Sequence, residues 1–274
     1  MNIKLTAQPA TDGAGVKIQR VMPRDFSLLD PFLMIDEIRS SDAADYMAGF
    51  PEHPHRGFET ITYMIEGALE HRDSLGNSGV VESGGVQWMT AGRGLIHEEM
   101  PKLREGQFHG FQVWLNLPAD EKMQPGVYRD LSADQIPQLT TEGYRAQVLA
   151  GRFVSADQEV VQGPINQART DPHWFDVALQ GTLSLTLNAD LNAWVYVCEG
   201  ELEVQSESIN RLNAHEMMRL DGVNLVFKSD SARIQIFAGR PLGEPVVQHG
   251  PFVMNTAEQI NQAIRDFTQG RLVG

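Results

Sequence analysis

The chain has 274 residues, of which 42% are hydrophobic, and a single cysteine, Cys198. These values indicate a globular protein with one large domain or two ordinary ones, and they exclude an intramolecular disulfide. The net charge of −14, from 22 basic and 36 acidic residues, disfavours direct binding to nucleic acid. No apolar run approaches the roughly 20 residues that span a bilayer, and the first residues lack the layout of a secretion signal. We therefore expect a cytoplasmic protein that does not bind membranes.

Short alternating segments, separated by Gly, Pro, Asn, Asp and Ser, make up most of the chain. The clearest are FETITYMI, VVESGG, FQVWLNL, SLTLN, WVYV, LVFK and RIQIF. Alternation with period two predicts β-strands, and many short strands predict an all-β sandwich or barrel. The last segment differs, because Thr256 and Gln259 form a capping box before apolar residues at helical spacing, and Gly270 would end the helix. The sequence thus predicts a C-terminal α-helix.

Two pairs of segments resemble each other in the same order along the chain. Residues 63–70, YMIEGALE, resemble residues 196–203, YVCEGELE. Residues 111–118, FQVWLNLP, resemble residues 234–241, IQIFAGRP. Short strand segments also match by chance, but two ordered matches favour a duplicated β-domain. We place the boundary in the polar stretch after Pro118, which gives domains 1–122 and 123–274, the second ending in the helix.

Two short pairs of metal-binding side chains stand out. His53 and His55 flank a proline in EHPHRGFETITY, and His97 and Glu99 follow a glycine turn in GRGLIHEEM. Residues i and i+2 of a strand point to the same face, about 6.6 Å apart along it, so each pair can approach one ion. Three imidazoles and a carboxylate suit iron, manganese, nickel, cobalt or zinc. Two places of an octahedron would remain for water, O2 or an organic oxygen.

Other interpretations of these residues stay open at this point. An HxH pair is often only surface polarity, and Glu98 or Glu59 could take the place of Glu99. Strand parity argues against Glu98, because it would point away from His97. Parity would also turn Arg56 outward. Four apolar residues could either line a cavity beside the metal ligands or belong to the ordinary hydrophobic core, namely Phe58, Trp88, Met89 and Phe111. His71 and His109 are candidates for orienting the ligands.

The runs HPHRGFETITY, QWMTAGRGLIHEEMP and GEPVVQHGPFVMNT resemble those of the pirin family of bicupins, from about Asp30 to the C-terminal helix. The resemblance implies an all-β fold of two tandem cupin-type β-barrels with a C-terminal helix. It also implies one mononuclear metal, Fe(II), in the N-terminal barrel, although the ligand types alone accept Ni, Mn, Co or Zn. The metal ligands of the family correspond to these residues of this chain: His53, His55, His97 and Glu99. In the second repeat the positions of His53 and His55 are occupied by Thr186 and Asn188, so we expect a metal-free C-terminal barrel.

The resemblance implies a metal-dependent dioxygenase that opens flavonols such as quercetin with O2. Glu99 would then be both a ligand and the catalytic base. The alternative is a redox-sensing, iron-binding regulator that acts through a protein partner. A third reading is a structural cupin with an adventitious ion. We expect a monomer.

Overall fold

The computed structural model of the protein describes residues 3–104, 106–155, 159–166, 169–205 and 209–273. The chain divides into two compact units. The N-terminal unit comprises Gln8–Ala133 and Leu242–Gly274, and the C-terminal unit comprises Met1–Ala7 and Asp134–Pro241. This division differs from the expected one in two ways. The first unit extends past residue 122 to Ala133, and each end of the chain packs with the other unit's main segment.

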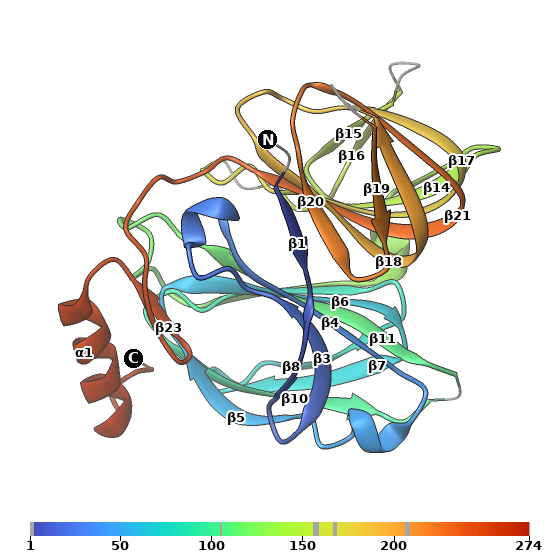
Figure 1. Ribbon diagram of the computed structural model, residues 1–274. Helices are drawn as coiled ribbons and strands as arrows, with labels where there is room; N and C mark the ends of the chain where they lie inside the picture. The colour runs from blue at the N-terminus through green and yellow to red at the C-terminus, as the bar shows by residue number, and fades with distance from the viewer. Residues whose placement is uncertain (1–2, 105, 156–158, 167–168, 206–208, 274) are drawn as a thin grey trace. The chain divides into compact units, whose positions relative to one another are not determined.

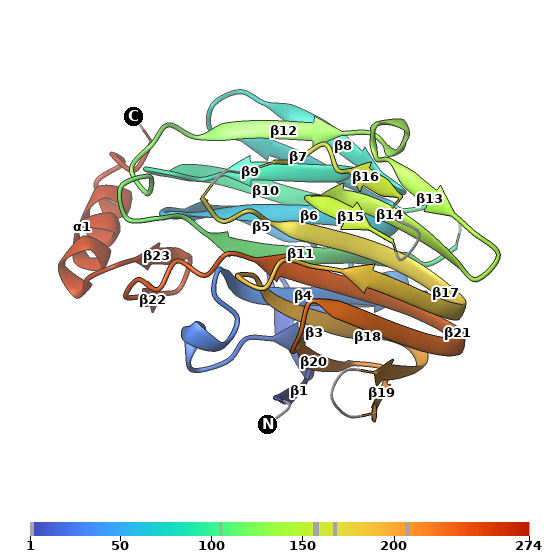
Figure 2. The same cartoon turned by 90° about the horizontal axis from the view of Figure 1, so that it is seen from above.

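The N-terminal unit contains two principal sheets. The seven-stranded sheet has the order β12-β9-β6-β11-β4-β3-β2. Figure 2 labels its strands from β12 to β3. Its strands are β2 (Gln8–Asp12), β3 (Val16–Val21), β4 (Phe32–Ser40), β6 (Phe58–Glu66), β9 (Val86–Thr90), β11 (Phe108–Asn116) and β12 (Val127–Leu131). The four-stranded sheet has the order β5-β10-β7-β8, with β5 (Phe50–His55), β7 (Ala68–Asp73), β8 (Ser78–Glu82) and β10 (Leu95–Lys102). Two short 3-10 helices, Phe26–Leu28 and Ala43–Asp45, lie in the connections.

The burial pattern of β10 shows which of its side chains face the interior. Buried and half-buried residues alternate along this strand, so His97 and Glu99 share the buried face. In the part of the chain that the structure describes, no strand of one sheet pairs with the other sheet. The predicted all-β class is confirmed, but the sheets are open and do not close into the barrels that we expected.

The C-terminal segment belongs to the N-terminal unit, where Figure 1 shows it in red beside β5. It forms the hairpin β22 (Val247–His249) and β23 (Phe252–Met254), followed by α1 (Ala257–Thr268). The predicted helix and its capping box are confirmed, since the Gln259 amide donates to Thr256 Oγ1 and the Gln259 side chain accepts from the Thr256 amide. Ile260 and Ala263 are buried on its inner face. At 12 residues, α1 is too short to cross a membrane, and none of the described helices could do so.

The C-terminal unit is built on one eight-stranded sheet, ordered β1-β20-β18-β21-β17-β14-β13, with β19 paired to β18. The strands are β1 (Lys4–Thr6), β13 (Gln138–Thr140), β14 (Tyr144–Ala150), β17 (His173–Thr186), β18 (Asn192–Gln205), β19 (Ile209–Asn213), β20 (Glu216–Leu220) and β21 (Asn224–Gly239). A small hairpin, β15 (Arg152–Val154) and β16 (Val160–Gln162), and the 3-10 helix Ala133–Gln135 complete the elements. Tyr196 and Ile234 lie on the neighbours β18 and β21, as Tyr63 and Phe111 lie on the neighbours β6 and β11. The sequence matches thus fall on corresponding strand pairs.

Candidate metal centre

Three histidines converge where β5 and β10 pair. His97 lies directly opposite His53, and Leu95 lies opposite His55, in an antiparallel register with an irregularity between His97 and Glu99. One ring nitrogen from each histidine lies within 4.8 Å of the others. His55 and His97 are buried, and His53 is half-buried. The structure therefore brings together the three imidazoles of the predicted ligand set.

A backbone carbonyl contacts one ring nitrogen of each histidine on β5. His53 Nδ1 donates to the Pro51 carbonyl at 2.8 Å, and His55 Nδ1 lies 3.4 Å from the Pro251 carbonyl. Because a carbonyl can only accept, Nδ1 is the donor in both contacts, which leaves Nε2 as the ring nitrogen available to a metal. Metal-binding histidines commonly have this arrangement. Pro251 belongs to the C-terminal segment, which thus takes part in orienting a candidate ligand.

His97 presents a buried nitrogen that nothing in the described structure satisfies. Its Nε2 has no hydrogen-bond partner among the described residues, while the Tyr128 hydroxyl lies 3.4 Å from Nδ1. Burial, and then the neighbouring His55, hold the pKa of His97 well below its usual value. Burial followed by His53 has the same effect on the pKa of His55. Neutral imidazoles with free lone pairs fit a divalent transition metal, which binds only the deprotonated nitrogen.

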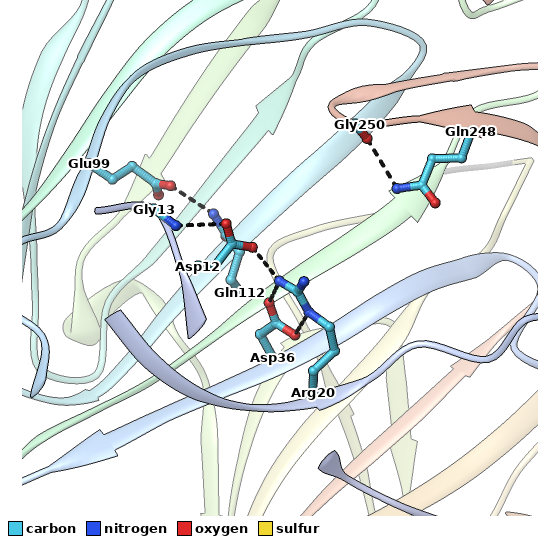
Figure 3. Close-up of polar contacts among 8 residues, drawn as sticks. All are labelled: Asp12, Gly13, Arg20, Asp36, Glu99, Gln112, Gln248 and Gly250. Atoms are coloured by element: carbon cyan, nitrogen blue, oxygen red, sulfur yellow. Dashed lines mark hydrogen bonds and ion pairs between the residues drawn. The ribbon is translucent and has the colours of Figure 1, made fainter. Parts of the chain in front are cut away.

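Glu99 lies outside the group of three nitrogens and accepts hydrogen bonds from two side chains, of which Figure 3 shows the one from Gln112. Gln112 Nε2 donates to its Oε2 at 2.8 Å, and Thr62 Oγ1 donates to its Oε1 at 2.8 Å. Burial raises the pKa of Glu99, against the opposing effect of His53 and these hydrogen bonds. The carboxylate is therefore fixed in position and more basic than an exposed one.

The two alternative carboxylates are placed elsewhere. Glu98 lies opposite Arg72 on β7 and is half-buried, so it alternates away from the face that His97 and Glu99 share. Glu59 is buried and accepts a hydrogen bond of 2.6 Å from Thr90. Neither residue lines the cavity beside the histidines.

A cavity of about 660 Å³ is lined by His53 and His55, and its volume is within the size range of small-molecule sites. Its apolar wall includes Met34, Ile38, Phe50 and Trp114. The sequence-based candidates for this wall, Phe58, Trp88, Met89 and Phe111, do not line it. Phe58 instead packs behind the site, with its ring 5.0 Å from His55 and 4.4 Å from Trp114. Sequence reasoning missed Trp114, although it lies two residues from Gln112 on the same face of β11.

Three residues near the ligands have roles that differ from expectation. Arg56 is 4% exposed. Its guanidinium donates to Asp266 on α1 at 2.8 Å and to the Arg93 carbonyl. It points away from the cavity but is buried under the helix. His71 pairs with Asp130 at 3.0 Å and stacks on Tyr128. His109 binds Glu37 at 2.8 Å, on the opposite face of β4 from the cavity-lining Asp36.

Comparison with known proteins identifies the family of the chain. The Pirin family model matches residues 15–115, and the model of the Pirin C-terminal cupin domain matches residues 174–273. The chain belongs to the pirin family. A Pseudomonas aeruginosa protein named "Putative quercetin 2,3-dioxygenase" is 45% identical over 97% of this chain and 95% of its own length. Mouse Pirin is 36% identical over 99% of this chain and 93% of its own length.

Solved structures agree with this membership. The crystal structure of a quercetin 2,3-dioxygenase from Acinetobacter baumannii superposes with a TM-score of 0.88 at 32% identity. The match covers 98% of this chain and 96% of that one. The bicupin architecture inferred from the resemblance is thereby confirmed.

Proposed function

We propose that this pirin is a metal-dependent dioxygenase that opens flavonols such as quercetin. The observation that carries the proposal is the set of three convergent imidazoles, of which His53 and His55 line a cavity of about 660 Å³. The relative from P. aeruginosa and the structure from A. baumannii bear the name of this activity. His53, His55, His97 and Glu99 would hold one Fe(II). When bound, the metal supplies Lewis-acid activation of the substrate hydroxyl and a redox-active centre for O2 chemistry.

Glu99 is suited to accept the proton of the flavonol hydroxyl. Its burial raises its pKa toward that of an effective base, and it lines the cavity in which the substrate would lie. Thr62 and Gln112 fix its two oxygens, so the carboxylate need not reorganise as it receives the proton. The same two hydrogen bonds would restrain Glu99 if it also contacted the metal.

The apolar wall would position the flat rings of a flavonol and exclude water. Trp114 lies against His55, with ring centroids 5.4 Å apart at 77°, so its side chain is held in place beside the ligands. Met34 lies directly opposite Trp114 on β4, and both side chains line the cavity. Aromatic and thioether side chains bind planar apolar ligands well, and their contact leaves little room for water at the reacting end.

Oxygen uptake by iron-loaded protein tests the proposal. Protein loaded anaerobically with one Fe(II) per chain is mixed with quercetin and O2, and flavonol loss is followed by absorbance. We expect oxygen uptake that matches flavonol loss, and neither in His97→Ala. Protein that holds one iron per chain yet consumes no oxygen would contradict the proposal.

A further inference from the structure

Four polar side chains form a row across the large sheet of the N-terminal unit. Thr62 on β6 lies opposite Gln112 on β11, Gln112 lies opposite Asp36 on β4, and Asp36 lies opposite Arg20 on β3. Residues directly opposite each other on antiparallel strands project from the same face. The row therefore begins at the two residues that hold Glu99 and ends at Arg20, and its last three members line the cavity.

The span of this row corresponds to the length of a ligand. Adjacent strands lie about 4.8 Å apart, which places the backbones of Gln112 and Arg20 roughly 10 Å apart. A flavonol is a flat molecule of three rings whose length is of this order. A flavonol whose 3-hydroxyl meets Glu99 would thus bring the phenyl ring at its C2 position, called the distal ring below, to Arg20.

Arg20 is held rigidly at the far end of the row (Figure 3). Its Nε donates to Asp36 Oδ1 at 2.8 Å, its Nη2 donates to Asp36 Oδ2 at 2.6 Å, and Nη2 also contacts Asp12. Among the described residues, these contacts engage Nε and Nη2 only. The two N–H groups of Nη1 can therefore donate to a ligand oxygen in the cavity.

The charges around Arg20 select against an anionic ligand. The cavity wall carries four carboxylates, from Asp12, Asp36, Glu52 and Glu99, against a single guanidinium. Burial raises the pKa of Asp36 to about 6, although Arg20 opposes the rise, so the pair is ionised at neutral pH. A carboxylate or phosphate at this end would meet net negative charge. An uncharged hydroxyl could accept from Nη1 and donate to a carboxylate oxygen.

Apolar side chains border the polar row on both sides. Trp114 and Met34 lie two residues from Gln112 and Asp36 on one side, and Ile38 and Ile18 lie two residues from Asp36 and Arg20 on the other. A flat aromatic ligand can lie along the row with its faces or edges on these residues while its polar substituents meet the row itself.

We propose that Arg20 is a specificity-determining residue that recognises an uncharged hydroxyl on the flavonol ring far from the metal. The inference rests on the proposed function, because it assumes a flavonol whose other end lies at Glu99. It adds the substrate class that the cavity favours, namely neutral flavonols hydroxylated on the distal ring.

Ligand binding without turnover tests this assignment. Galangin, kaempferol and quercetin differ only in carrying none, one or two hydroxyls on the distal ring. Their dissociation constants are measured without O2 on metal-loaded protein, by quenching of tryptophan fluorescence and by calorimetry. We expect wild-type protein to bind quercetin roughly tenfold more tightly than galangin, which is the order expected of hydrogen bonds to a charged donor. In Arg20→Lys the ratio should fall to about one, with galangin binding little changed.

The C-terminal unit offers a matched control. Arg233 Nε donates to Asp176 Oδ1 at 2.9 Å and its Nη2 also contacts this carboxylate, in a pair as buried as that of Arg20. Arg233→Lys should leave the quercetin-to-galangin ratio unchanged. If Arg20→Lys does not fold, Arg20→Met/Asp36→Leu removes both buried charges together, a replacement that proteins often tolerate. We expect the same loss of discrimination in that variant.

The outcomes separate the two proposals. An equal loss of affinity for all three flavonols, or an unchanged ratio, would overturn the role of Arg20. Discrimination that depends on Arg20, in a protein that consumes no O2, would support the inference and contradict only the dioxygenase activity. Failure of metal-loaded wild-type protein to bind any of the three would overturn both.

Discussion

Glu99 combines two properties that a ligand and a base require, and its surroundings provide both. Its oxygens accept hydrogen bonds from Thr62 and Gln112, which restrict its orientation. Its burial disfavours the ionised form and so strengthens it as a proton acceptor. A substitution that keeps the shape and removes the charge can distinguish the two roles.

Glu99→Gln should slow turnover far more than it weakens metal binding. An amide keeps one oxygen for a metal but cannot accept the substrate proton, and loss of a general base typically costs 10²–10⁴-fold in rate. We expect a fall in kcat of about 10²-fold or more, with a smaller rise in the Kd for iron, measured by competition with a chelator. Glu98→Gln, at the half-buried neighbour on the other face of β10, should change neither value. Equal losses of rate and affinity in Glu99→Gln would leave Glu99 as a ligand only.

The sequence revealed the histidines because their spacing is local, whereas the residues around them depend on strand register. His53 and His55 share a face through parity alone. Gln112, Asp36 and Arg20 become neighbours only because three separate strands pair in one register. No short-range pattern encodes that pairing. The same limit applies to the cavity wall, where alternation alone could not show which face of β11 points inward.

The C-terminal segment illustrates what could be predicted at the level of elements. The helix was predictable, because a capping box and apolar spacing are local signals. Its attachment to the N-terminal unit was not, since it depends on contacts between residues some two hundred positions apart. Val253 donates its amide to the Arg56 carbonyl at 3.0 Å, and Asp266 accepts from the Arg56 side chain. Strand parity predicted that Arg56 points outward. Arg56 does not line the cavity, but it is 4% exposed, because it pairs with Asp266 on α1, which parity could not show.

Lys122 joins this segment to the sheet through a buried ammonium group. It is 1% exposed and donates to the carbonyls of Gly57 and Val253 and to Asn116 Oδ1, at 2.6, 3.2 and 2.6 Å. These three acceptors match its three N–H groups. Burial lowers its pKa to about 7, against the attraction of Glu244.

Stability should therefore rise with pH between about 7 and 10 because of Lys122. Over this range the unfolded chain, with the ordinary lysine pKa of 10.5, binds a proton that the folded protein has released. Relative to Lys122→Met, the free energy of unfolding of the wild type should increase by up to about 1.4 kcal/mol per pH unit. Urea unfolding at several pH values measures this slope.

The matched control is Lys102→Met, which removes a lysine that is 34% exposed and pairs with Glu70. Its difference from the wild type should not show the same slope. Parallel pH profiles for the wild type and Lys122→Met would mean that the buried amine keeps its proton throughout.

For the whole molecule, the internal repeat was a better guide than the expected boundary. The duplicated segments fall on corresponding strands of two units, yet each unit includes one end of the chain that sequence order assigns to the other. β1 pairs with β20 in the C-terminal unit, while β23 and α1 pack in the N-terminal unit. A single boundary in the sequence cannot describe units that each contain one terminal segment of the chain, because strand pairing and helix packing determine where those segments lie.

The asymmetry between the two units leads to a prediction for metal binding. The repeat aligns His53 and His55 with Thr186 and Asn188, which offer no imidazole. We expect one iron per chain by elemental analysis of protein reconstituted and then freed of excess metal. His53→Ala/His97→Ala should retain none, because the one remaining imidazole, His55, binds a metal only weakly by itself.

Metal should also stabilise the N-terminal unit selectively. A ligand that binds only the folded state at a free concentration of 100 times its Kd adds about 2.7 kcal/mol of stability. If the two units unfold separately, Fe(II) should raise the midpoint of only one calorimetric transition, and hydrogen exchange should slow in β5 and β10 but not in β18 and β21. The double variant should show neither effect. A second equivalent of iron that persists in the double variant, or protection that appears in β18 and β21, would show that the C-terminal unit binds metal as well.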